Sequence, residues 1–277
     1  MFVVFRRGSF AALVLAFAGL LASTAHGLGE TLRVGGTGAA LGTMKMLSGP
    51  FAAAHPGVEV DVLPSLGSGG GVRALGKGVV DVAVIAGELG EADRANGFVA
   101  VPYGSSPLVF VTSRADRQSV STAEVADILA GRRLAWPDGR PIRLVMRPRK
   151  ESDYLMLGAY TPAMRAAIEM AGARSELPIA VTDQDALDML ESLEGSFGFS
   201  TLAAVVSEKR RLSVLALDGV APTLDAVAGG AYGFVKSFQL VLRRDSGPRA
   251  QAFAAFATSP EGRRLVRAAG NLPTVRR

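Results

Sequence analysis

The chain has no cysteine among its 277 residues and only two histidines, His26 and His55. Without cysteine it can form no disulfide, no thiolate nucleophile, no iron–sulfur cluster and no cysteine zinc site. Two histidines are too few for a histidine-rich metal centre, so we expect neither a metal nor a cofactor. Aromatic residues make up 6% of the chain, whereas glycine occurs 33 times, which favours tight loops over aromatic stacking platforms.

Long hydrophobic runs are scarce as well, and the one that stands out lies near the start. Arg6 and Arg7 precede an apolar run over residues 10–22, and small residues follow it up to Ala25. This order is typical of a secretory signal peptide, and the run is shorter than the roughly 20 residues of a membrane span. We therefore expect residues 1–25 to be a cleaved signal peptide and the mature protein to be exported, with no stable membrane anchor. A retained anchor is the alternative.

The charge balance gives no sign of a nucleic-acid partner. The chain has 30 basic and 25 acidic residues, a formal charge of +5. Residues 1–25 contain two arginines and no acid, so the mature count is 28 minus 25, or +3. No basic stripe is interleaved with aromatic residues, which nucleic-acid surfaces commonly show. We expect no nucleic acid among the partners.

Apolar residues recur with strand and helix periods in alternation, which predicts an α/β fold with mostly parallel sheets. We expect strands near residues 31–34, 58–63, 79–85, 99–103, 108–112, 142–146, 212–217 and 232–242. We expect helices near residues 38–54, 122–130, 154–171 with a break at Pro162, 183–193 and 248–270.

Three loops that contain glycine, serine, threonine or arginine lie where a predicted strand ends and a helix begins. They cover residues 35–40, 65–71 and 147–154, and the third begins with Arg147. In α/β folds, ligands bind beyond the carboxyl ends of strands, where helix N-termini present free N–H groups to anions. An arginine adds a bidentate charged donor. The three loops together indicate anion binding.

Signatures of catalysis are weak by comparison. Residues 71–78 resemble a phosphate-binding P-loop, but Gly78 stands where a serine or threonine should hold magnesium. Leu66 replaces the first glycine of a nucleophile elbow around Ser68, and no histidine is placed to serve as its base. We therefore expect no enzyme and no catalytic residues. A secreted serine hydrolase is the alternative.

Several stretches of the chain match one family. Residues 51–58 read FAAAHPGV, residues 67–75 GSGGGVRAL and residues 78–83 GVVDVA, and the carboxyl part carries GSFGF at 195–199 and SPEG at 259–262. In these stretches and in their order, the mature chain resembles the periplasmic phosphate-binding proteins of ABC transporters, within the type II periplasmic solute-binding family. The resemblance covers most of the mature chain.

The resemblance implies two α/β lobes that close on a ligand in the cleft between them. Mapped on this chain, lobe I would comprise residues 28–105 and 236–277, and lobe II residues 106–235. It also implies a periplasmic location, a small anionic ligand such as phosphate, an ABC transporter permease as partner, and a monomer. The positions that match the family's ligand contacts are Thr37, Gly38, Ala39, Ser68, Gly69, Arg147, Ser152 and Asp153.

The resemblance assigns roles to some of these positions and leaves others open. Ser68 matches the serine that donates a hydrogen bond to the anion, whereas Arg147 or Arg149 matches the arginine of lobe II. Ala86 stands where phosphate-binding members carry an aspartate, and the carboxylates Glu151 and Asp153 stand where they carry small neutral residues. Phosphate, another oxyanion and an organic anion therefore remain open as ligands. A sensor or adhesion module on the same fold is the alternative function.

Overall fold

The computed structural model describes Met1 and residues 30–274. Apart from Met1, the predicted signal peptide over residues 1–25 lies outside the described residues. Within the described part of the chain, no helix is both long and apolar enough to span a membrane.

The strands follow the expected order along the chain. They are β1 (Glu30–Gly36), β2 (Val58–Val62), β3 (Val82–Ala86), β4 (Phe98–Thr112), β5 (Ser119–Val120), β6 (Arg143–Leu144), β7 (Ser196–Thr201), β8 (Ser213–Leu217), β9 (Val235–Arg243) and β10 (Leu272–Pro273). The α/β class is confirmed.

The helices alternate with these strands. They are α1 (Gly38–Ala54), α2 (Gly67–Gly76), α3 (Glu91–Ala95), α4 (Thr122–Leu129), α5 (Ser152–Tyr160), α6 (Pro162–Ala173), α7 (Asp183–Ser192), α8 (Leu202–Ser207), α9 (Leu224–Ala228), α10 (Pro248–Thr258) and α11 (Pro260–Ala268). The break at Pro162 is present, because this proline begins α6 and the Thr161 side chain caps its N-terminus. The glycine-rich stretch expected as a loop instead forms the first turns of α2.

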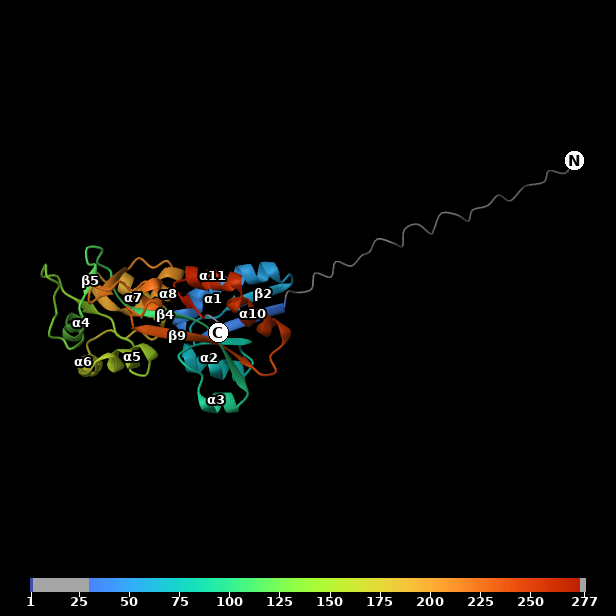
Figure 1. Cartoon of the computed structure of the whole chain (residues 1–277), viewed down its shortest axis with the longest axis horizontal. Helices are drawn as coiled ribbons and strands as arrows, with labels where there is room; N and C mark the ends of the chain where they lie inside the picture. Colours follow the sequence, from blue (N-terminus) through green and yellow to red (C-terminus); the bar gives the residue numbers. More distant parts are fainter. Residues whose placement is uncertain (2–29, 275–277) are drawn as a thin grey trace.

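The sheet is mixed, so the expectation of mostly parallel pairing is wrong. Its strand order is β2-β1-β3-β9-β4-β7-β6. β1 is parallel to β2 and β3, but β9 is antiparallel to both β3 and β4. β4 and β9 lie side by side and run in opposite directions (Figure 1). β4 is also antiparallel to β7, β8 and β10.

β4 is one continuous strand where two shorter strands were expected. Residues 98–107 of β4 pair with β9, and residues 108–112 pair with β7 and β8. The two expected strands would be separated by the turn-like residues Gly-Ser-Ser-Pro at 104–107. In the structure, the ladder between β4 and β9 has a register shift just before them, between Pro102 and Gly104. β4 therefore belongs both to the part of the sheet that contains β9 and to the part that contains β7 and β8.

The buried side chains form two groups of clusters, which we call the first core and the second core. The first core draws its members from residues 32–103 and 238–266. The second core draws its members from residues 108–234. α1 shows how the sequence pattern builds the first core: Leu41, Met44, Leu47 and Phe51 are buried at helical spacing.

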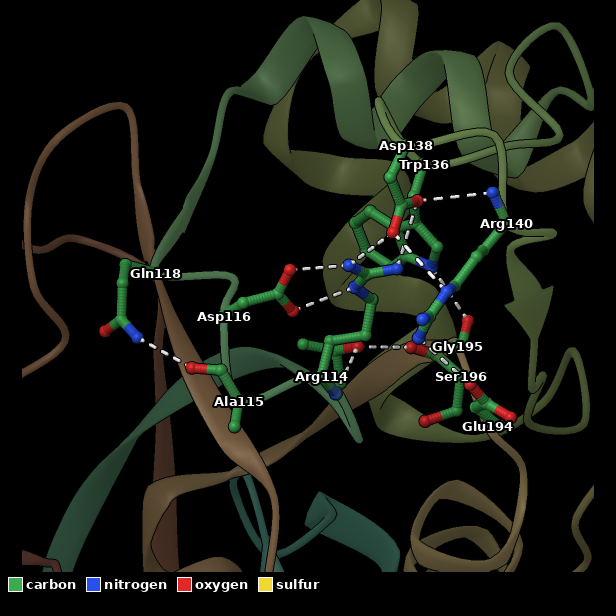
Figure 2. A network of polar contacts seen from close by, with 11 residues as sticks. Arg114, Ala115, Asp116, Gln118, Trp136, Asp138, Arg140, Glu194, Gly195 and Ser196 are labelled. Atoms are coloured by element: carbon green, nitrogen blue, oxygen red, sulfur yellow. Dashed lines mark hydrogen bonds and ion pairs between the residues drawn. The ribbon is translucent and has the colours of Figure 1, made fainter.

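A network of polar contacts ties together three loops beside the second core (Figure 2). The Arg114 guanidinium contacts the carboxylates of Asp116 and Asp138, which keeps the pKa of both carboxyls below their usual range. The same guanidinium lies 5.7 Å from the ring centroid of Trp136, the only tryptophan of the chain. The indole N–H donates to the Gly195 carbonyl at 3.0 Å. Trp136 is therefore held in a defined environment.

Candidate functional site

Helices α1, α2 and α5 begin at the three loops that the sequence singled out. Among the described residues, none of these three N-termini has a side chain that accepts a capping hydrogen bond. Six other helices do have such a cap, provided by Ser121, Thr161, Thr182, Thr201, Thr223 and Ser259. The first N–H groups of α1, α2 and α5 therefore remain available to another acceptor.

The start of α1 is fixed by a close approach of two strands. A Cβ on Gly36 would lie 1.9 Å from the Val84 carbonyl oxygen, and the φ angle of Gly36 is +151°. Only glycine fits both conditions. The next N–H, that of Thr37, donates to the same Val84 oxygen at 2.9 Å. Thr37, Gly38 and Ala39 thus form the buried first turn of α1 at the end of β1.

Ser68 lies in the first turn of α2 and faces β3. Its Oγ accepts a hydrogen bond from the Ala86 N–H at 3.0 Å. Because this bond uses an oxygen lone pair, the hydroxyl proton remains free to be donated to a ligand. Ala86 pairs with Phe238 on β9, two positions from Lys236. Gly69 follows Ser68 and is exposed.

Arg147 is a buried arginine, with 5% of its surface exposed. Its Nη1 donates to the Ala180 carbonyl at 2.9 Å, and its Nη2 lies 3.4 Å from Asp183 Oδ2 and 3.8 Å from Glu151 Oε2. Its Nε is buried and has no hydrogen-bond partner. A buried donor without a partner is costly, so an acceptor supplied by a ligand would be favoured there.

Asp153, in the first turn of α5, contacts the Lys236 ammonium directly. The two side chains are 4% and 3% exposed, and they come from α5 and β9. This pair therefore joins the helix that follows the Arg147 loop to the strand that runs beside β4. Ser152 is the first residue of α5 and is half-buried.

Asp183 lies at the start of α7 and links the two sides of the site. Its Oδ2 would be 2.6 Å from a Cβ on Gly38, so only glycine leaves room for the carboxylate against α1. Burial raises the pKa of Asp183, repulsion from Asp153 raises it further, and the charges of Arg147 and Lys236 oppose both effects. These neighbouring charged side chains therefore act electrostatically on Asp183.

The structure places Arg147, Asp153 and the first turn of α1 around Asp183, and it adds Asp183 and Lys236 to the residues that the sequence indicated. Asp183 connects Arg147 to the first turn of α1, and Asp153 is part of the same charged cluster. Among the described residues, no hydrogen bond joins Ser68, Gly69 or Ser152 to this cluster. The sequence analysis did not single out Asp183 or Lys236 as candidates for the site. A lone lysine in the apolar run of β9 was the one available signal.

Other candidate residues have structural partners. Asp81, the carboxylate of the GVVDVA stretch, accepts a hydrogen bond from the Arg33 N–H at 2.8 Å, so it serves as a structural carboxylate. Arg149 is exposed and donates to the Gly172 carbonyl at 3.2 Å, whereas Arg147 is buried beside Asp183. Within residues 30–274, no group of histidine and carboxylate side chains is arranged to hold a metal ion.

Comparison with known structures finds the same fold. A protein of Clostridium perfringens described as a phosphate ABC transporter substrate-binding protein, solved with bound phosphate, matches with a TM-score of 0.71 and 18% identity. The match covers 89% of this chain and 100% of that one. An ABC-type phosphate transport receptor of Vibrio cholerae matches with a TM-score of 0.60 and 17% identity, covering 87% of this chain and 99% of that one.

A third structure, a phosphate-binding protein of Stenotrophomonas maltophilia, has a TM-score of 0.64, 15% identity, and coverage of 89% and 91%. At these identities the three structures show a common fold. No curated protein sequence matches the chain. A family model described as a PBP superfamily domain matches residues 22–261, which is most of the sequence. The chain therefore belongs to the PBP superfamily.

Proposed function

We propose that the chain is an exported, non-enzymatic solute-binding protein that captures a small oxyanion, with inorganic phosphate as the first candidate. The ligand would lie against Arg147, Ser68 and the N-termini of α1, α2 and α5. The protein would act in the periplasm as a monomer and deliver its ligand to an ABC transporter permease. The matching structures support this proposal, since one of them holds phosphate and another is a phosphate transport receptor.

The observation that carries the proposal is the buried, incompletely bonded guanidinium of Arg147. A buried arginine whose Nε lacks a partner has capacity for one more acceptor oxygen. Ser68 has a hydroxyl proton to donate, and three helices offer uncapped N–H groups. These are all donors, and an oxyanion provides acceptors only or almost only.

We further propose that the two cores correspond to two lobes that open and close on the ligand. The lobe boundaries would be those expected from the family, with residues 28–105 and 236–277 in lobe I and 106–235 in lobe II. β4 and β9 connect the cores, so both would bend at the hinge. Across the cleft, Gln184 on α7 donates to the Gly38 carbonyl of α1 at 3.0 Å, a contact that opening would break.

Thermal unfolding of the mature protein in the presence of inorganic phosphate tests the proposal. Phosphate at about 100 times its dissociation constant should stabilise the folded state by about 2.7 kcal/mol. For a protein of this size that corresponds to a rise in Tm of about 5–10 °C. Arg147→Ala should abolish the rise. Arg165→Ala is the matched control, because Arg165 is exposed on α6 and its guanidinium, like that of Arg147, donates to a backbone carbonyl, here that of Gly158.

Sulfate, arsenate and small organic acids would be screened under the same conditions. If one of these anions raises the Tm and phosphate does not, that anion is the ligand and the proposed site stands. If none of these anions shifts the Tm, or if the shift persists in Arg147→Ala, the proposed function is wrong.

A further inference from the structure

The carboxylate of Asp183 already pairs with Arg147, the side chain that the proposed function assigns to an incoming anion. Its Oδ2 is 3.4 Å from the Nη2 of Arg147. The same oxygen lies against the first residue of α1, 2.6 Å from where a Cβ on Gly38 would be. Asp183 is therefore placed between the guanidinium and the helix N-terminus, two features that favour negative charge.

The charge of the cluster leaves little room for a further anion. Two cations, Arg147 and Lys236, face three carboxylates, Glu151, Asp153 and Asp183, so the formal sum is −1 when all are ionised. An oxyanion added to this cluster would raise the negative charge to −2 or beyond. Burying uncompensated negative charge is strongly unfavourable, so one carboxylate has to move away or take up a proton when the ligand enters.

Among the three carboxylates, Asp183 is the one that competes with the ligand. Asp153 is in direct contact with Lys236, and both side chains are almost fully buried. Glu151 is 3.8 Å from Arg147 and its side chain is 29% exposed, so water solvates part of its charge. Asp183 is 10% exposed, lies closer to Arg147 and also touches α1. The unpartnered Nε of Arg147 shows independently that the carboxylates do not satisfy the guanidinium.

We propose that Asp183 is a built-in competitor that sets the affinity of the anion site. In the absence of ligand its carboxylate serves as the counter-ion of Arg147, and the ligand binds only when that carboxylate is displaced or neutralised. This inference rests on the proposed function, since it concerns the same site. It makes Asp183 a determinant of affinity, so its removal strengthens ligand binding, whereas removal of a ligand contact would weaken it.

Calorimetric titration with inorganic phosphate tests the inference. Asp183→Asn keeps the shape of the side chain and removes its charge, and Asp183→Ser is a second neutral variant that suits a helix start. Both should bind phosphate at least about tenfold more tightly than the unmodified chain, which is about 1.4 kcal/mol. Asp188→Asn is the matched control, because Asp188 lies on the same helix with its side chain 67% exposed and paired with Arg210. The affinity of Asp188→Asn for phosphate should be the same as that of the unmodified chain.

The outcomes separate this inference from the proposed function. Tighter binding in both Asp183 variants, including binding that appears only in them, supports the competitor. If the unmodified chain binds phosphate and the variants bind equally or less tightly, Asp183 is a ligand contact or a structural residue, and only this inference is overturned. If neither the unmodified chain nor the variants bind phosphate or any other anion tested, both proposals are overturned.

Discussion

The buried pair of Lys236 and Asp153 allows a sharp prediction about stability. Lys236→Met removes the ammonium but keeps most of the apolar stem, so Asp153 is left as a buried carboxylate without its partner. Removing one member of a buried ion pair typically costs about 3–5 kcal/mol. The Lys236 and Asp153 side chains are 3% and 4% exposed, so solvent screening does not reduce this figure much. For a folded protein of ordinary stability, about 5–15 kcal/mol, the loss is large.

Urea unfolding followed by fluorescence measures this loss, because the single tryptophan, Trp136, is buried in the second core and so reports on its packing. Replacing both partners, as in Lys236→Met with Asp153→Leu, should return the stability to within about 1 kcal/mol of the original or raise it, since two apolar side chains leave no charge behind. Lys45→Met is the control: Lys45 is exposed on α1, and its loss should change stability by less than about 0.5 kcal/mol. A loss below about 1 kcal/mol in Lys236→Met would show that the pair behaves as a solvated surface pair and refute the reasoning.

Two further predictions concern contacts between α1, in the first core, and α7 and α8, in the second core. Burial and repulsion from Asp153 raise the pKa of the Asp183 carboxyl in the folded chain. The carboxyl therefore binds a proton more tightly in the folded than in the unfolded chain, and the folded state loses stability as the pH rises above 3.8, the ordinary pKa of an aspartate. In phosphate-free buffer at about pH 7, Asp183→Asn should therefore have a higher Tm than the unmodified chain. This difference in Tm should shrink toward zero near about pH 4. A difference in Tm that is the same at every pH would contradict this prediction. A Cβ on Gly42 would lie 2.0 Å from Ser207 Oγ, so Gly42→Ala should destabilise the protein by about 1–3 kcal/mol in urea, and adding Ser207→Gly should recover most of that loss. No recovery would mean that the clash lies elsewhere.

Elements governed by local patterns could be predicted from the sequence. The bounds of α1 follow from its periodic apolar residues and from the His55-Pro56-Gly57 stop. The position of the break before α6 follows from Pro162, which cannot continue a helix. The three anion-type loops were recognisable because glycine and small polar residues mark strand-to-helix connections.

The charged cluster could not be predicted, because its pairs are distant in the sequence. Arg147 and Asp183 are 36 positions apart, and Asp153 and Lys236 are 83 positions apart. No periodicity or motif relates such positions, and only the arrangement of α5, α7 and β9 around the end of the sheet brings them together. β4 was misjudged for a related reason, since its turn-like residues over 104–107 are held in the strand by pairing with β9, a partner more than 120 positions away.

The location of the anion itself tests the central claim most directly. Arsenate is a tetrahedral oxyanion with the shape of phosphate, and its arsenic atom gives an anomalous X-ray signal. Crystals of the mature protein grown with arsenate should show one anomalous peak with arsenate oxygens within hydrogen-bonding distance of Arg147 and Ser68, and with the Asp183 carboxylate moved away from the guanidinium. An arsenate bound elsewhere, with Arg147 still paired to Asp183, would contradict the account.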